Sequence, residues 1–207
     1  MKPNKELVEH YKRDLRSAGY RGAARALGFA SLYHCGRRLD GSPEISHQIE
    51  IASYLRRVVP FKGLERALVV TMLHDVREDG GVANCVIRSM FGNLVAEDVT
   101  NLTKSFRGAS LPLDYAFRMP VRSPVSAIVK GADRIHNLQT MDNAFSDKKK
   151  TEYRSETMTH IYPMLQSARA TYPSCSATLT QIMRDIRSLV FPSHTTTYAS
   201  ERIPYDA

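Results

Sequence analysis

Apolar residues recur at helical spacing through almost the whole 207-residue chain, and this pattern limits the fold more than any other feature. Near the N-terminus, Leu7, Val8, Tyr11 and Leu15 follow the three- and four-residue spacing that places side chains on one face of an α-helix. No segment alternates apolar and polar residues over more than a few positions, as a half-buried strand would, and no internal repeat is found. The pattern therefore predicts an all-α fold.

Turn-forming and capping residues divide the chain into the expected helices. Ser46 is expected to cap a helix that Val59, Pro60 and Phe61 close. Residues 108–124 contain three prolines and are expected to be looped or broken. The other helices are predicted over about residues 21–33, 64–74, 84–90, 94–102, 126–141, 149–172 and 177–189.

The chain length favours one domain. We expect this domain to span residues 1–191, with a motif-bearing core over about residues 22–141 and C-terminal helices over about residues 149–190. Residues 192–207 are expected to form a flexible tail. Hydrophobic residues make up 43% of the chain, enough for a globular core without disulfides or a structural metal.

The cysteines and the N-terminal residues indicate in which cellular compartment the protein is expected. Cys35, Cys85 and Cys175 are scattered and form no Cys-x-x-Cys pair, which fits a reducing environment. The N-terminus is charged and lacks the apolar run of a signal peptide, and no stretch of about 18 apolar residues could cross a membrane. We therefore expect a cytoplasmic protein without a membrane partner.

The formal charge of the chain is +8. A basic surface attracts anionic partners, either nucleic acid or a polyphosphate nucleotide. The same charge also occurs on soluble proteins that have no particular partner. The charge alone therefore does not decide between a nucleic-acid partner, a nucleotide partner and no partner.

His74 and Asp75 follow an apolar helical run, which places an imidazole and a carboxylate at the buried end of a helix. Burying both is costly unless something pairs with them, and a divalent cation is an efficient partner. His47 and Asp133 would supply two more ligands from two other helices. Two imidazoles and two carboxylates suit manganese, iron or zinc. Such a metal would polarise a phosphoryl oxygen and lower the pKa of a bound water.

Further polar residues are spaced to face the same cavity. Glu78 and Asp79 stand four positions after His74 and Asp75, on the same face if the helix continues. A carboxylate beside the water can orient it and take its proton. Asn137 stands likewise to the carboxylate four positions before it. The surrounding positive charge would come from Arg38, Lys104, Lys130 and Arg134.

Residues of about 22–141 resemble the hydrolase domain of RelA/SpoT-type proteins and the small alarmone hydrolases that consist of this domain alone. The matching pieces occur in the family's order and at roughly its spacing. They are R-x-D-G-S-P-x-x-x-H at 38–47, H-D-x-x-E-D at 74–79, F-G-x-x-V…V-x-x-L-T-K at 91–104 and K-x-A-D-R-x-H-N-x-x-T at 130–140.

The resemblance implies an HD-type helical bundle that binds one manganese ion and hydrolyses the 3′-pyrophosphate of (p)ppGpp, releasing pyrophosphate and GDP or GTP. Glu78 and Asp79 match the pair that acts on the water. Arg38 matches a residue that packs on the base, and Asn137 one that contacts the sugar. Lys104, Lys130 and Arg134 are further substrate-binding candidates, although Lys104 or Arg134 could equally be exposed or structural. The implied metal ligands are His47, His74, Asp75 and Asp133.

The chain departs from the family at several positions. Leu39 stands where the family has a basic residue, Gln48 where it has proline, and Gly80 where it has threonine. The segment before Asp133 is also shorter. Because Leu39 offers no side-chain hydrogen bond to a base, we expect hydrolysis of the adenine analogue (p)ppApp as well. The residues after about 172 are too few for a synthetase domain, so hydrolysis alone is expected.

Two other functions remain as alternatives. One is an HD phosphohydrolase that acts on dNTPs, nucleoside monophosphates or NADPH. The other is a basic nucleic-acid-binding protein with a vestigial HD site, although a vestigial site has no need for all four ligands. His136 is interpreted as a core or partly exposed residue, with a role beside the metal ligands as the alternative, and His34 as a surface or structural residue.

Overall fold

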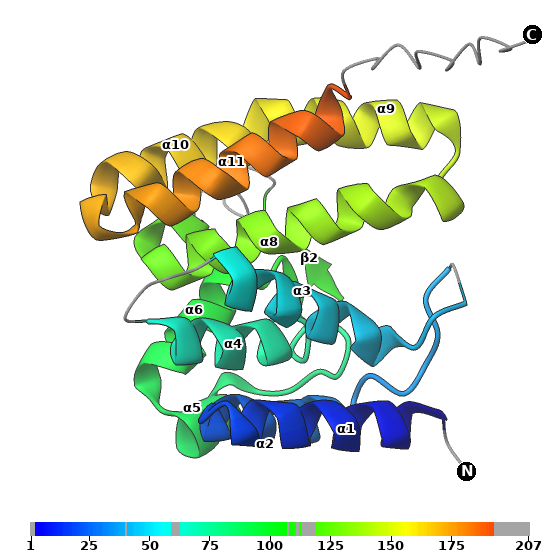
Figure 1. Ribbon diagram of the computed structural model, residues 1–207, viewed down its shortest axis with the longest axis vertical. Helices are drawn as coiled ribbons and strands as arrows, with labels where there is room; N and C mark the ends of the chain where they lie inside the picture. The colour runs from blue at the N-terminus through cyan, green and yellow to red at the C-terminus, as the bar shows by residue number, and fades with distance from the viewer. Residues whose placement is uncertain are drawn as a thin grey trace, which may run out of the picture.

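A computed structural model describes residues 3–39, 41–58, 63–106, 108–110, 112 and 119–192 of the chain. The described chain is mainly helical, and the all-α prediction is confirmed (Figure 1). The α-helices are α1 (Pro3–Ser17), α2 (Arg21–Ala30), α3 (Glu44–Val58), α4 (Leu64–Leu73), α5 (Asn84–Phe91), α6 (Asn93–Leu102), α8 (Pro124–Thr140), α9 (Asp147–Glu156), α10 (Tyr162–Thr171) and α11 (Ser176–Val190).

Short elements connect these helices. Strands β1 (Ser105–Phe106) and β2 (Ala109–Ser110) pair antiparallel, with Ser105 opposite Ser110. A π-helical turn, Thr157–Ile161, joins α9 to α10. The 3₁₀ turns are η1 (Met119–Arg122), η2 (Met141–Asn143) and η4 (Pro173–Cys175).

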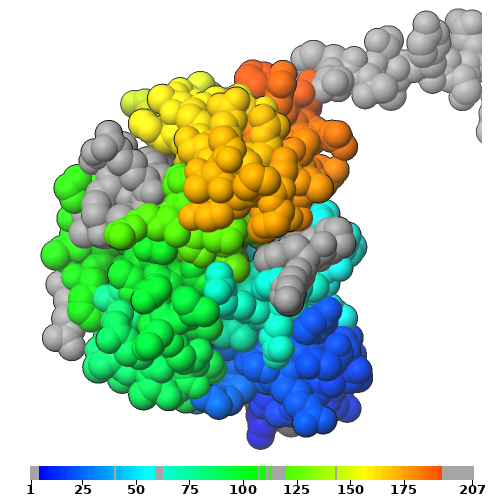
Figure 2. Space-filling view, turned by 90° about the vertical axis from the view of Figure 1, so that its left-hand side faces the viewer, coloured from blue at the N-terminus to red at the C-terminus, as the bar shows by residue number. Residues whose placement is uncertain are grey.

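Helix α8 lies at the centre of the molecule. It packs against α3, α4 and α6 on one side and against α10 and α11 on the other. Figure 1 shows α1 and α2 at one end and α9 to α11 at the other, and Figure 2 shows the same division from a second side. Nearly every residue of α8 from Val125 to His136 is buried, so this helix carries its polar side chains through the core.

Two local features explain how α8 and α4 are buried. After its charged first turn, helix α4 is apolar except for Thr71, and its residues from Ala67 to Leu73 are all buried. In α8, Gly131 permits a close approach to the C-terminal helices, because a Cβ there would lie 2.6 Å from Ile182 Cγ2 and 3.1 Å from Leu165 Cδ2.

The helix boundaries differ from the sequence expectation at three places. Helix α3 begins at Glu44, so Ser46 is not its cap; the Ser46 hydroxyl instead donates a hydrogen bond of 2.7 Å to the Pro43 carbonyl within the first turn. The Ala-rich helix α2 ends at Ala30, three residues early. Val59, Pro60 and Phe61, expected to close the third helix, lie outside the described residues.

The third difference concerns residues 149–172, which were expected to form one helix. The structure divides this stretch into α9, the π-helical turn and α10. Pro163 lies in the first turn of α10, where it cannot donate the backbone hydrogen bond of a continuous helix. The expected break over residues 108–124 is confirmed where described, and the tail from residue 193 lies outside the described residues. None of the described helices has the length and apolar character needed to cross a membrane.

Candidate metal centre

Three helices bring the four predicted ligands together. His47 comes from α3, His74 and Asp75 follow the end of α4, and Asp133 comes from the middle of α8. His47 Nε2 lies 3.2 Å from Asp133 Oδ1 and 3.9 Å from Asp75 Oδ2. His74 Nε2 lies 3.0 Å from Asp75 Oδ2 and 4.0 Å from Asp133 Oδ1. Each imidazole therefore approaches both carboxylates through its Nε2.

The outer nitrogens of the two imidazoles are held by other groups. His74 Nδ1 lies 2.8 Å from the Thr71 carbonyl and donates to it, which leaves Nε2 without a proton in the neutral ring. His47 Nδ1 lies 2.9 Å from His136 Nδ1, and His136 Nε2 lies 2.9 Å from Glu50 Oε2. These contacts fix the orientation of both rings.

The electrostatics of the cluster reflect its burial and its mixed charges. Burial favours the neutral form of His74, but the Asp75 and Asp133 carboxylates raise the pKa of this imidazole to about 9. Burial also opposes ionisation of the two carboxyls, yet the pKa of Asp75 is lowered by His74 and the pKa of Asp133 is lowered by Lys130 and His47. The two carboxylates are thus ionised and favour the protonated form of His74, and a metal bound at Nε2 would take the place of that proton.

The donor set fits a divalent transition metal. Ligand atoms of His47, His74 and Asp75 lie within 4.8 Å of one another, and Asp133 Oδ1 is close to both imidazoles. His74 Nε2 is buried and faces the Asp75 carboxylate at 3.0 Å, although the pair does not have the geometry of a hydrogen bond. A metal bond would satisfy both this nitrogen and the carboxylate.

Glu78 and Asp79 lie in the turn that follows α4. The α-helix ends at Leu73, before Glu78, although hydrogen bonds from Asp79 N to Asp75 O (2.9 Å) and from Gly80 N to Val76 O continue a helix-like path. Glu78 Oε1 accepts a hydrogen bond from the backbone N–H of Lys104.

Asp79 lies beside a buried histidine that the sequence interpretation left as structural. Asp79 Oδ2 is 3.7 Å from Nδ1 of His34, whose side chain is only 2% exposed. Burial and the nearby charges of Asp75 and Glu78 raise the pKa of Asp79 to about 6. Asp79 therefore titrates near the pH at which a proton acceptor is most useful.

Two lysines border the carboxylates. Lys130 is buried, and its Nζ lies 3.1 Å from Asp133 Oδ2, the oxygen that faces away from the imidazoles. Burial and the charge of Lys104 lower the pKa of Lys130 to about 8. Lys104 is exposed, and although neighbouring atoms partly desolvate its ammonium group, Asp133, Glu78 and Asp75 raise its pKa overall. Both lysines thus belong to the charge network of the cluster.

Arg38 and Asn137 form a second line of contacts to Asp133. The Asn137 amide donates to Asp133 Oδ1 at 2.7 Å, and the Arg38 guanidinium donates to Asn137 Oδ1 at 3.3 Å. Beside Arg38 is a hollow of about 230 Å³, lined by Leu39, Thr140, Ala144 and Phe145. Leu39 is 79% exposed, so it faces this hollow and solvent rather than the core. Asp40 of the same motif lies outside the described residues.

Arg134 makes structural contacts, which was one of the roles considered for it from the sequence. Its guanidinium is buried, with one nitrogen 2.6 Å from Glu156 Oε1 and another donating to the Thr157 hydroxyl at 3.2 Å. It also lies 3.9 Å from the ring centre of Tyr153. These partners tie α8 to α9 and to the π-helical turn, and they explain how an arginine is accommodated in the core.

The sequence interpretation left the role of His136 open between two alternatives, and it missed Glu50. Glu50 stands three positions after His47, and His136 three positions after Asp133. Helical spacing alone could have placed both beside a ligand. It could not have shown that the two side chains meet each other.

Comparisons with known proteins identify relatives by sequence and by fold. No protein-family model matches the chain. A probable guanosine-3′,5′-bis(diphosphate) 3′-pyrophosphohydrolase of Synechocystis is 34% identical over 149 residues, covering 68% of this chain and 19% of that protein. The bifunctional (p)ppGpp synthase/hydrolase SpoT of Escherichia coli is 30% identical over 135 residues, covering 61% of this chain and 19% of that protein.

Other relatives are named as GTP pyrophosphokinases rather than as hydrolases. A GTP pyrophosphokinase of Streptomyces antibioticus is 27% identical over 173 residues, covering 80% of this chain. The chain spans about a fifth of the length of the curated relatives it matches. A solved structure of a metazoan orthologue of SpoT, described as hydrolysing ppGpp, is 22% identical, with a TM-score of 0.59 over 81% of this chain and 96% of that one. This likeness shows that the fold is the HD-type helical bundle.

Proposed function

We propose, from the homology of the chain to RelA/SpoT-type proteins, that it hydrolyses the 3′-pyrophosphate of (p)ppGpp. Water attacks the phosphorus attached to the 3′ oxygen, the bond between them breaks, and pyrophosphate and GDP or GTP leave. The observation that carries the proposal is the approach of two imidazoles, each through its Nε2, to two carboxylates at distances of 3.0–4.0 Å. Names of the relatives include both hydrolases and pyrophosphokinases, and this donor set favours hydrolysis.

His47, His74, Asp75 and Asp133 would hold one manganese ion. When bound, a divalent cation supplies Lewis acidity, which offsets phosphoryl charge and lowers the pKa of a water. Nδ1 of His74 is already committed to the Thr71 carbonyl, so the ring is oriented before any ligand arrives.

Glu78 and Asp79 are assigned to the attacking water. The Asp79 carboxylate, with its pKa near 6, is mostly ionised at neutral pH and can accept the water proton. Glu78 is held by the Lys104 backbone N–H, which orients its carboxylate beside the same turn.

Arg38, Asn137, Lys104 and Lys130 are assigned to the substrate. Arg38 would stack on a purine and Asn137 would contact the sugar; the hollow that Arg38 lines and the hydrogen bond between the two side chains support this assignment. Lys104 and Lys130 would offset phosphate charge near Asp133. Arg134 is withdrawn from this group because its guanidinium is buried against Glu156 and Tyr153.

A turnover panel tests the proposal. We expect ppGpp and pppGpp to be hydrolysed to pyrophosphate with manganese, and chelator to abolish the activity. Asp133→Ala should lose both metal and turnover, as measured by metal analysis and chromatography. If dNTPs or NADPH were hydrolysed while ppGpp was not, the substrate assignment would be wrong; full metal content and activity in Asp133→Ala would overturn the site.

We also propose that the chain hydrolyses the adenine analogue (p)ppApp. The exposed Leu39 lines the hollow beside Arg38 and offers no hydrogen bond to a base edge. Discrimination between purines requires such bonds, whereas stacking does not. Rates on the two purified nucleotides should lie within about one order of magnitude, the effect of a contact of about 1.4 kcal/mol. A guanine preference of several orders of magnitude would contradict this proposal.

A further inference from the structure

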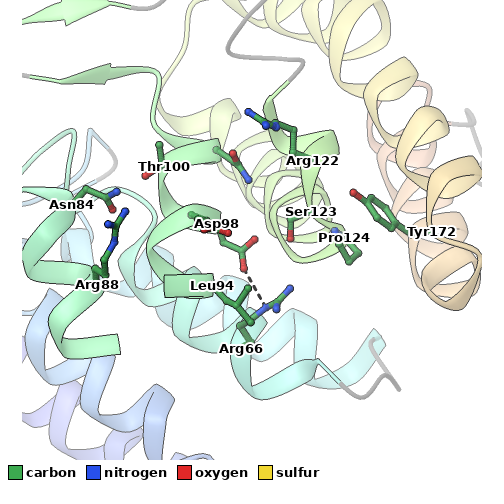
Figure 3. Close-up of a pocket in the computed structure, with 12 residues that line it drawn as sticks. Arg66, Asn84, Arg88, Leu94, Asp98, Thr100, Arg122, Ser123, Pro124 and Tyr172 are labelled. Carbon is green, nitrogen blue, oxygen red and sulfur yellow. Dashed lines mark ion pairs between the residues drawn. The ribbon is translucent and has the colours of Figure 1, made fainter. Parts of the chain in front are cut away.

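A larger hollow, of about 690 Å³, lies apart from the metal centre (Figure 3). It forms where the start of α4, helices α5 and α6 and the start of α8 meet, beside the end of α10. None of the four candidate metal ligands lines it. Its volume is within the range of about 300–1,000 Å³ that is typical of small-molecule sites.

An ion pair forms one wall of this hollow. Arg66 Nε lies 3.1 Å from Asp98 Oδ2, as the dashed line in Figure 3 marks, and the Ser126 hydroxyl donates to Asp98 Oδ1 at 2.9 Å. Asp98 is only 2% exposed. The negative charge of Asp98 is therefore already balanced, and this wall is structural.

Two further arginines line the hollow and have no ion-pair or hydrogen-bond partner within the part of the chain that the structure describes. Arg88 comes from α5 and Arg122 from η1. Glu97 also lines the hollow and is exposed. With Arg66 and Asp98 included, three positive charges face two negative ones. Guanidinium groups bind phosphate through paired hydrogen bonds, so two free ones from separate elements favour a ligand with several phosphate oxygens.

The remaining lining suits a nucleoside. Asn84 lines the hollow, and its Oδ1 is shielded from solvent and has no hydrogen-bond partner among the described residues, so it meets a ligand when the side chain rotates toward the hollow. This acceptor requires a donor, which a sugar hydroxyl or base amino group provides and an ionised phosphate does not. The Tyr172 hydroxyl is committed to the Val121 carbonyl at 2.9 Å, and Leu94 is 59% exposed, so both offer apolar surface to a ring.

We propose that this hollow binds a nucleoside polyphosphate at a site separate from the one assigned to hydrolysis. Arg88 and Arg122 bind the phosphates, and Asn84 accepts a hydrogen bond from the nucleoside. A cavity with a few placed polar groups and an apolar portion is the usual form of such a site.

Helix α6 connects this hollow to the turn after α4, which carries Glu78 and Asp79. Thr100 lines the hollow, and its hydroxyl accepts a hydrogen bond of 3.0 Å from Arg77, which lies between Asp75 and Glu78. Just beyond the end of α6, the Lys104 N–H donates to Glu78. A ligand that biases the position of α6 therefore acts on the residues assigned to the water, so occupancy should change the rate of (p)ppGpp hydrolysis. This second step rests on the proposed function.

Equilibrium dialysis with GTP as the probe tests the binding step. We expect the wild type to bind two equivalents, and Arg38→Ala to weaken only the site assigned to hydrolysis. The double variant Arg88→Ala/Arg122→Ala should lose the other site, with affinity at least about tenfold weaker, because two charge-assisted contacts are removed. The control double variant Arg169→Ala/Arg187→Ala removes the same charge from exposed positions on α10 and α11 and should bind as the wild type does.

Several outcomes would overturn the binding step. Unchanged two-site binding in Arg88→Ala/Arg122→Ala, with a melting temperature like that of the wild type, would exclude the arginines. Loss of all GTP binding in Arg38→Ala alone would reduce the two sites to one. Inorganic pyrophosphate binding as tightly as GTP would exclude recognition of the nucleoside.

A separate variant tests the coupling. Thr100→Val removes the acceptor for Arg77 while keeping the shape of the side chain. We expect it to bind GTP at the remote site but to lose the effect of that GTP on (p)ppGpp hydrolysis. An unchanged effect would exclude this route. Equilibrium dialysis does not require turnover. If the protein did not hydrolyse (p)ppGpp, the dialysis would therefore still test whether the remote site binds GTP.

Discussion

At the scale of single residues, the metal centre is a set of buried polar groups whose outer atoms are already occupied. Lys130 and Asn137 donate hydrogen bonds to the two oxygens of Asp133, and Nδ1 of His74 donates to the Thr71 carbonyl. Buried polar groups cost free energy unless they are paired, so these contacts keep the cluster stable. The Nε2 atoms of His47 and His74 face the carboxylates of Asp133 and Asp75 across the shared centre.

Glu78 offers a test that separates chemistry from metal binding. Glu78→Gln keeps an amide oxygen that can accept from the Lys104 N–H, so the turn should retain its shape. Turnover should fall by about 10²-fold or more, the usual scale of acid–base catalysis. Metal content, measured on the same samples, should stay near that of the wild type. Glu152→Gln, on the exposed face of α9, is the matched control; a Glu78→Gln protein without metal would make Glu78 a ligand instead.

His136 offers a test of ligand orientation. If His47 binds metal through Nε2, its Nδ1–H donates to His136 Nδ1, and His136 Nε2–H donates to Glu50. His136→Ala removes this support and should weaken manganese binding by about 10–100-fold. The manganese dissociation constant, measured from free Mn²⁺ by electron paramagnetic resonance, needs no turnover.

Glu50→Gln keeps an acceptor beside His136 and should weaken manganese binding less than His136→Ala does. His10→Ala, at an exposed position of α1, should have no effect. Equal affinity in His136→Ala and the wild type would show that the ring of His47 is held by packing alone.

At the scale of elements, α8 combines the site with the main packing surface. Its residues Lys130, Asp133 and Asn137 face the metal centre, while Gly131 faces α10 and α11. Arg134 fastens the same helix to α9 through Glu156. The position of Asp133 therefore depends on contacts made by residues that have no part in the chemistry.

A pair of glycine substitutions tests this dependence. Gly131→Ala would place a Cβ 2.6 Å from Ile182 Cγ2 and should destabilise the protein by about 1–3 kcal/mol, as overpacking does. Gly28→Ala, inside α2, meets only Lys12 at 3.6 Å and should be neutral or stabilising by up to about 1 kcal/mol. Urea unfolding of both variants measures the difference. Equal stabilities would show that α8 can move away from α11 without cost.

At the scale of the whole molecule, the ligands join helices that are distant in sequence. A metal bound by α3, by the end of α4 and by α8 would cross-link the N-terminal layers to the central helix. A ligand that binds only the folded state stabilises it by mass action, by about 2.7 kcal/mol at 100 times its dissociation constant.

Manganese at that concentration should therefore raise the melting temperature by about 5–10 °C for a chain of this size. Chelator should reverse the shift, and Asp133→Ala should show none. Differential scanning calorimetry of the three samples measures this. A shift that persists in Asp133→Ala would place the stabilising ion somewhere else.

Local patterns in the sequence determined which segments are helical and which residues are candidates for chemistry. The apolar run of α4 that ends at His74 and Asp75, and the four-residue spacing of Asp133 and Asn137, are properties of short stretches, so they can be read without knowing how the helices pack. The all-α fold and the existence of α5 and α6 are confirmed by the structure, while the roles of the individual site residues stay predictions. Ser46 as a cap was wrong because a helix start depends on one or two local hydrogen bonds.

The tertiary structure alone decided which of these residues meet. His136 reaches both His47 and Glu50, from positions more than 80 residues away, and Arg134 is withdrawn into an ion pair with Glu156. The hollow with Arg88 and Arg122 likewise joins side chains from separate helices and turns. The physical reason is that periodicity specifies the face on which a side chain lies, whereas its partner depends on how that face packs against another helix.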